Sequence, residues 1–183
     1  FVKPAIGPGR HWVVTYQSFV GLAFNTKEVS AAEAPKTYED LLDPKWKGKM
    51  ALSGRSSTLG NLVGTLVLTK GEDYVRKLGK QNVTVFQMSG RALSNMVVTG
   101  EAALSPGVYS SHMANSKRKG ASVDWRALGP VYGNNGVGSL SRQAPHPHAA
   151  MLFLDYILSK DSQEFRKTLG YSTGRKDIVD RGK

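Results

Sequence analysis

The sequence has no cysteine and no long apolar run, and each absence narrows the class of protein. Without cysteine, disulfides, thiolate metal sites and cysteine nucleophiles are excluded. No stretch of 18 apolar residues occurs, so no membrane-spanning helix is predicted. A charged segment followed by an apolar one, as in a secretion signal, does not open the chain. Because the first residue is Phe1, we expect a processed or cut product.

Acidic residues are also scarce, and this leaves the chain strongly basic. The 14 aspartates and glutamates face 25 lysines and arginines, which gives a net charge of +11. Such a balance attracts anions, whether a small acid, a phosphate, nucleic acid or a membrane surface. The tightest basic groups, 45–49 and 117–119, are not interleaved with aromatic residues as in single-strand nucleic-acid binders. A solvated surface is the favoured interpretation of both groups, and no nucleic-acid partner is predicted.

The motifs that would indicate an enzyme are missing as well. A nucleotide P-loop needs G-x-x-x-x-G-K-[ST], but Gly54 and Gly60 lie six apart and no Lys-Ser/Thr follows. G-x-S-x-G and HExxH do not occur, and no pair of carboxylates stands out. His146 and His148 have no third metal ligand nearby. The sequence therefore predicts a protein that is not an enzyme and holds no cofactor.

Residue patterns predict alternating strands and helices. Apolar, β-branched and aromatic residues indicate strands at 13–26, 49–53, 82–87 and 102–106, with an extended Gly-rich stretch over 122–142. Helical spacing indicates helices at 36–44, 58–68, 71–79, 94–101 and 108–119, and one long amphipathic helix over 149–169. Such alternation is typical of an α/β sheet with helical cover.

Three strand-to-helix junctions, at 53–58, 89–94 and 105–111, are rich in serine and glycine. Ligands of α/β sheets bind outside the carboxyl ends of strands, and helix N-termini favour anions. Arg55 offers a bidentate clamp for a carboxylate or phosphate. The hydroxyls of the first junction either donate to a ligand or cap the helix, and they belong to Ser53, Ser56, Ser57 and Thr58. Both interpretations stay open.

Tyr109, at the third junction, has several chemical uses. Its phenol is a hydrogen-bond donor, a stacking platform or a phenolate ligand for a hard ferric ion, unless it only packs at the strand end. His112 lies three residues further on and is expected to face solvent on the helix.

Several motifs together resemble a known family. They are GLAFNTKEVSAAEAPKTYEDLLDPKWKGKMALS at 21–53, GEAAL at 100–104 and APHPHAAMLFLDYILSKDSQEF at 144–165. In these stretches the chain resembles bacterial extracellular solute-binding proteins of ABC importers. The nearest group is the ferric-iron-type, type 2 periplasmic binding proteins, whose relatives bind polyamines, phosphonates and sugar phosphates.

The resemblance implies an α/β fold of two lobes that are joined by hinge strands and trap a ligand between them. By this likeness, 1–26 is an N-terminal segment with the crossing hinge strand, and 27–130 is a complete second lobe. The returning hinge strand is then 131–142, and 143–183 are C-terminal helices of the first lobe. The chain is expected to lack the N-terminal part of the family. Helix 149–169 would expose its apolar side unless a partner covers it, for instance a second copy in a homodimer.

The resemblance also implies a function and a set of ligand-binding residues. The expected contacts are Tyr16, Ser53, Arg55, Ser56, Ser57, Ser89 and Tyr109, and the loop 89–91 is expected to reach the ligand. Tyr109 matches a place where iron-binding members carry adjacent tyrosines, but its neighbour is Ser110, so the paired phenolate is missing.

The implied function is capture of a small anionic solute, or of ferric iron with an anion, for delivery to an ABC permease. The implied location is periplasmic, or lipid-anchored and extracellular. The alternatives are a transferase on the same two-lobe fold and a receptor for a signalling kinase.

Overall fold

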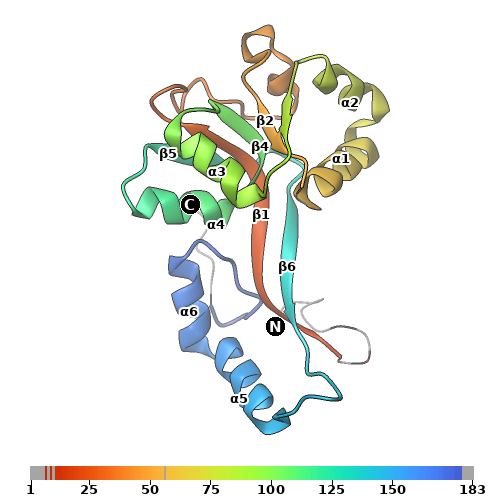
Figure 1. Cartoon of the computed structure of the whole chain (residues 1–183), viewed down its shortest axis with the longest axis vertical. Coiled ribbons are helices and arrows are strands. Elements are labelled where there is room, and N and C mark those ends of the chain that lie inside the picture. Colours follow the sequence, from red (N-terminus) through yellow and green to blue (C-terminus); the bar gives the residue numbers. More distant parts are fainter. Residues whose placement is uncertain (1–6, 8, 10, 56, 179–183) are drawn as a thin grey trace. The chain divides into compact units, whose positions relative to one another are not determined.

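The computed structural model describes residues 7, 9, 11–55 and 57–178 (Figure 1). The chain divides into two compact units. The larger is Phe19–Tyr132, and the smaller combines Phe1–Ser18 with Gly133–Lys183. Within the described part of the chain, no helix has the length and apolar character needed to span a membrane.

A mixed sheet forms the centre of the larger unit. It consists of the strands β4–β1–β5 and the pair β2–β3, which an isolated bridge joins at β4. Its strands are β1 (Val13–Asn25), β2 (Ala51–Ser53), β3 (Thr84–Phe86), β4 (Leu104–Tyr109) and β5 (Val123–Arg126). Strand β1 is antiparallel to β4 and β5, whereas β2 is parallel to β3. A parallel bridge between Met50 and Leu104 joins β2 to β4. Strands β2, β3 and β4 therefore end at the same edge of the sheet.

Both faces of this sheet are buried under helices. The helices are α1 (Ser57–Lys70), α2 (Glu72–Gly79), α3 (Gly90–Thr99) and α4 (Ser110–Arg118). Leu22 and Phe24 of β1 pack in one apolar cluster with residues of α1 and α2. Ala23 lies on the opposite face, as the two-residue period of a strand requires, and packs with residues of α3 and α4. Figure 1 shows these helix pairs on either side of the sheet.

The sequence-based boundaries fail where two prolines occur. Strand β4 continues past Pro106 to Tyr109, although the sequence predicts its end at Pro106. The register passes from Gly21 opposite Val108 to Ala23 opposite Ser105, so β4 carries one extra residue. This bulge leaves ladder positions unpaired, which suits a residue without an N–H. Around Pro44, the predicted helix 36–44 is instead the 3₁₀ helices Glu39–Leu42 and Pro44–Trp46.

The prediction of helix 94–101 was also wrong at its start. Helix α3 begins at Gly90, because the Ser89 side chain accepts a hydrogen bond from the backbone N–H of Ala92 at 3.2 Å. A serine in this position satisfies a donor that the first helical turn leaves free. The helix ends at Gly100, whose φ of 86° is the left-handed conformation that favours glycine.

In the smaller unit, the single predicted helix 149–169 is two helices. They are α5 (Pro147–Leu158) and α6 (Lys160–Thr168). Ser159 lies between them in an extended conformation, and its hydroxyl accepts from the N–H of Ser162 at 3.3 Å. Strand β6 (Tyr132–Gly138) pairs with β1, and Thr15 donates to the carbonyl of Gly136 at 3.0 Å.

The apolar side of these helices is largely exposed. Met151 is 47%, Leu152 71% and Phe165 63% exposed, whereas Ile157 is 7% exposed. The exposure agrees with what the resemblance implies for this segment when no partner covers it.

A buried polar side chain, Gln163, connects the parts of the smaller unit. It is 1% exposed, and its Nε2 donates to the carbonyls of Thr15 at 2.8 Å and Ile157 at 2.7 Å. Its Oε1 accepts from the hydroxyl of Thr173 at 2.6 Å. Strand β1, the end of α5 and the segment after α6 thus share one amide.

The substitution Gln163→Met should lower the free energy of unfolding by about 2–4 kcal/mol, because it keeps the volume but leaves buried polar partners unsatisfied. Chemical denaturation followed by circular dichroism measures this change. The control Gln143→Met, at an exposed position, should change stability by about 0.5 kcal/mol or less. Equal effects of the two variants would contradict the assigned role of Gln163.

Candidate anion site at the carboxyl ends of β2, β3 and β4

The three serine-rich junctions of the sequence lie at one edge of the sheet in the larger unit. Helix α1 follows β2, α3 follows β3, and α4 begins directly after β4. The backbone N–H of Gly54 donates to the carbonyl of Phe86 at 2.8 Å. The hydroxyl of Ser53 donates to the carbonyl of Met88. These bonds connect the first junction to the second.

The serines at these junctions occupy different positions. Ser53 is 2% exposed, and its hydroxyl proton is engaged by Met88, so it stabilises the loop. Ser57 is exposed at the first position of α1, and Ser89 is exposed as the cap of α3. Ser56 lies outside the described residues. A direct ligand contact by any of these serines stays a prediction.

Two arginines carry the positive charge of this edge. Arg55 follows β2 and Arg91 is in the first turn of α3, and both are exposed. Among the described residues, no ion pair or hydrogen bond engages either guanidinium. Unpaired guanidinium groups beside helix N-termini favour carboxylates and phosphates, which they hold by charge-assisted bidentate hydrogen bonds.

His112 does not face solvent freely, so that prediction was wrong. It is half-buried, and its Nδ1 lies 2.9 Å from the hydroxyl oxygen of Ser94 on α3. Its ring meets the ring of Tyr109 edge-to-face, with centroids 5.5 Å apart. Burial, and then the charge of Arg91, lower the pKa of His112 to about 4, so the imidazole is neutral at pH 7. The spacing of three residues from Tyr109 was the sequence signal for this contact.

Tyr109 directly precedes α4, and Tyr132 contacts the start of α1. Tyr109 is the half-buried last residue of β4. The hydroxyl of Tyr132 donates to the carbonyl of Thr58 in the first turn of α1 at 2.8 Å. Burial raises the pKa of Tyr132, and the nearby hydroxyls of Tyr109 and Tyr38 raise it further. Sequence reasoning missed Tyr132, because its partner is 74 residues away.

Tyr16 belongs to the smaller unit, in the first part of β1. Its ring packs edge-on against Tyr171 with centroids 4.8 Å apart, and the guanidinium carbon of Arg166 lies 5.5 Å from the ring centroid. A role of Tyr16 in ligand binding stays a prediction.

The donor atoms of the larger unit suit an anion better than a bare metal ion. Among the described residues, no group of three or more His, Cys, Asp or Glu side chains is arranged to hold a metal. The ferric-ligand role of Tyr109 therefore stays a prediction.

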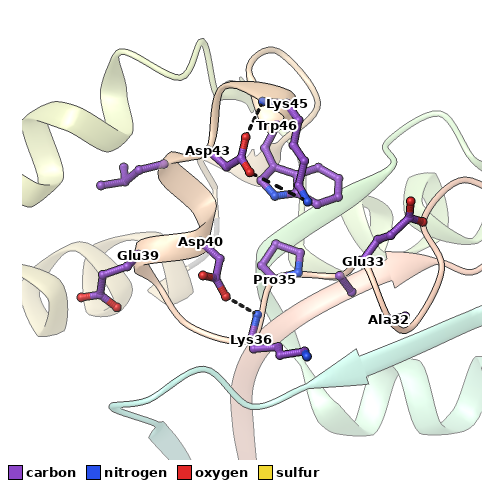
Figure 2. A pocket seen from close by; sticks show the side chains of 11 residues that line it. Ala32, Glu33, Pro35, Lys36, Glu39, Asp40, Asp43, Lys45 and Trp46 are labelled. Carbon is purple, nitrogen blue, oxygen red and sulfur yellow. Dashed lines mark hydrogen bonds and ion pairs between the residues drawn. The ribbon is translucent and has the colours of Figure 1, made fainter.

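A separate hollow of about 580 Å³ lies in the loops after β1, and Figure 2 shows side chains that line it. Carboxylates line it, and they already have partners. Asp40 accepts from the N–H groups of Lys36 and Thr37, and Glu39 pairs with Lys70 at 2.7 Å. Hydrogen bonding to these groups lowers the pKa of Asp40 and of Glu39, so both are ionised at neutral pH. This hollow therefore disfavours an anion.

Comparison with known proteins gives the family to which the chain belongs. The family model of bacterial extracellular solute-binding proteins matches residues 5–177. The chain belongs to this family. Its α/β fold is that of type 2 periplasmic binding proteins.

The chain spans only part of its relatives. An uncharacterized protein of Haemophilus influenzae is 31% identical over 175 residues, which cover 90% of this chain and 50% of the relative. Iron uptake protein A1 of Synechocystis is 27% identical over 161 residues, covering 79% of this chain and 44% of the relative. The structure of the periplasmic binding protein P5PA is 27% identical, with a TM-score of 0.71, and the match covers 98% of this chain and 66% of that one.

The low pKa of His112 makes the stability of this family member depend on pH. Below pH 6.5, the ordinary value for histidine, the unfolded chain binds a proton that the folded chain does not bind until about pH 4. The free energy of unfolding should therefore fall as the pH is lowered from 6.5 to 4. After allowance for solvent screening, the contribution of His112 is about 1–2 kcal/mol.

Denaturation at pH 7 and at pH 4.5 tests this effect. The variant His112→Gln should lose less stability than the wild type between these pH values, while the exposed control His148→Gln should behave like the wild type. The same loss in His112→Gln and wild type would contradict a buried neutral imidazole.

Proposed function

We propose that this chain is the ligand-binding part of the substrate-binding component of an ABC importer. It captures a small anionic solute, or ferric iron held with an anion, for delivery to a membrane permease. Membership in the solute-binding family supports this role. No covalent chemistry is required, because binding exchanges the hydration of the ligand for hydrogen bonds from the protein.

The observation that supports an anionic ligand is the pair of exposed guanidiniums of Arg55 and Arg91 beside helix N-termini, neither of which has a partner among the described residues. Helices α1, α3 and α4 begin at the edge where β2, β3 and β4 end. The first N–H groups of each helix lack intrahelical partners, and the helix dipole places partial positive charge there. The net charge of +11 raises the local concentration of anions further.

Ferric iron with an accompanying anion is the second candidate ligand. The phenol of Tyr109 at the end of β4 favours it, and one relative is named as an iron uptake protein. The positive charges of Arg55 and Arg91 require that the iron arrive with an anion, because they repel the bare ion. Iron is cargo in this proposal and not a resident cofactor.

The family supports further parts of the proposal. Solute-binding proteins are not enzymes, so we infer no catalysis, and the extracellular family description supports a periplasmic or lipid-anchored location. A sensory role beside a signalling kinase uses the same ligand site.

The exposed apolar side of α5 and α6 is where a homodimer would form, and size-exclusion chromatography with light scattering tests this contact.

Replacing these guanidiniums should weaken anion binding. Arg55→Gln and Arg91→Gln should each raise the dissociation constant for inorganic phosphate by about tenfold or more, since each removes a charge-assisted contact. Isothermal calorimetry at fixed ionic strength measures this constant, with ferric citrate titrated in a parallel series.

Arg76→Gln is the matched control, because it removes the same charge from α2 at an exposed position, where Arg76 pairs with Glu72 at 3.3 Å. It should bind phosphate like the wild type. An equal loss in all the variants would mean that net charge alone attracts the anion, and no binding of phosphate or ferric citrate would overturn the proposed ligand class.

A further inference from the structure

His112 introduces a hydrogen-bond acceptor into a site that otherwise offers donors. It stands on α4, and its ring lies between the ring of Tyr109 and the Ser94 hydroxyl of α3. Arg91 is near enough to lower the pKa of the imidazole. His112 is therefore at the same edge of the sheet as the proposed anion site.

The hydrogen bonds of Ser94 determine which nitrogen of His112 carries the proton. The Ser94 hydroxyl oxygen lies 2.7 Å from the carbonyl oxygen of Gly90. Two oxygen atoms at this distance need a proton between them, and only the hydroxyl can supply it. The single hydroxyl proton of Ser94 is thus engaged, so the 2.9 Å contact to Nδ1 of His112 requires that Nδ1 carry a proton.

The other ring nitrogen of His112 is then an acceptor. In a neutral imidazole protonated at Nδ1, Nε2 holds an unshared electron pair. Among the described residues, no group forms a hydrogen bond with Nε2, and this atom is not buried. Solvent or a ligand therefore reaches it.

We propose that His112 makes the site selective for oxyanions that carry an O–H donor, such as hydrogen phosphate or a hydroxylated phosphate ester. The inference rests on the proposed anion-binding function. A fully ionised oxyanion such as sulfate presents only lone pairs, and one of them would oppose the lone pair of Nε2. An anion with an O–H group donates to Nε2 while its other oxygens accept from the arginines and helix N–H groups. Such matching of donors to acceptors discriminates strongly between ligands of similar shape.

Ser94 acts here as a positioning residue. Without its hydroxyl, nothing at Nδ1 fixes the protonated nitrogen, and the proton exchanges between Nδ1 and Nε2. The substitution Ser94→Ala should therefore weaken the selectivity without removing any group that faces the ligand.

Calorimetry with inorganic phosphate and with sulfate at pH 7 and equal ionic strength tests the selectivity. The wild type should bind phosphate at least about tenfold more tightly than sulfate, as expected when an acceptor would be left unmatched. His112→Gln presents either an acceptor or a donor, so its preference should fall to about threefold or less. The exposed control His148→Gln should keep the wild-type preference.

Nitrogen NMR of the same proteins provides an independent readout. Long-range ¹H–¹⁵N spectra of the wild type should show a His112 ring protonated at Nδ1 and unprotonated at Nε2, and Ser94→Ala should shift the ring toward a mixture. A His112 ring protonated at Nε2 in the wild type would overturn the inference, whatever affinities calorimetry gives for phosphate and sulfate.

The remaining outcomes are distinct. Equal affinity for phosphate and sulfate in the wild type would overturn the selectivity of His112 while leaving the anion site intact. Failure to bind either ion would overturn the proposed anion-binding function, and the inference with it. Binding of ferric ion through Nε2, seen as loss of the His112 signal, would also overturn the inference.

Discussion

The parallel alignment of β2, β3 and β4 is the constraint on which the candidate site depends. A bridge between Met50 and Leu104 brings β4 beside the parallel pair of β2 and β3. The strands then end together, and the helices that follow begin together. Their first N–H groups have no partners within the helices, so the fold itself creates an electropositive edge. A reversed β4 would place the start of α4 at the opposite edge.

Ion pairs determine which lysine and arginine side chains of this basic chain are available to a ligand. Lys70 is engaged by Glu39 at 2.7 Å, and Lys117 by Asp124 at 3.0 Å. Exposed pairs of this kind stabilise the fold little, but they neutralise the charge locally. Arg55 and Arg91 have no such partner among the described residues. The neutral imidazole of His112 adds no competing charge beside them.

Much of the secondary structure could be predicted from the sequence, because it depends on local patterns. The strand expected over 13–26 is β1, and the helix expected over 58–68 is α1 with short extensions at both ends. The errors come from contacts that local patterns do not contain. A bulge carries β4 past Pro106, and a single extended residue, Ser159, divides the last helix.

In the candidate site, too, local sequence patterns could be predicted, whereas contacts between residues far apart in the chain could not. Arg55, Ser57, Ser89 and Tyr109 could be named because strand-to-helix junctions have a recognisable composition, and their contacts with a ligand stay predictions. The chemistry of His112 depends on Ser94, 18 residues away, and Tyr132 depends on Thr58, 74 residues away. Neither pairing has a local signature, so spacing along the chain could not reveal the protonated nitrogen of His112 or the contact of Tyr132.

In the proposed binding mode, one edge of the larger unit holds an oxyanion through helix N-termini and through Arg55 and Arg91. Titration of the ¹⁵N-labelled protein with inorganic phosphate, followed by amide NMR, tests it most directly. We expect saturable shifts concentrated at the first residues of α1, α3 and α4, together with the side-chain signals of Arg55 and Arg91. Shifts spread over all basic surfaces, or concentrated away from these helix starts, would contradict it.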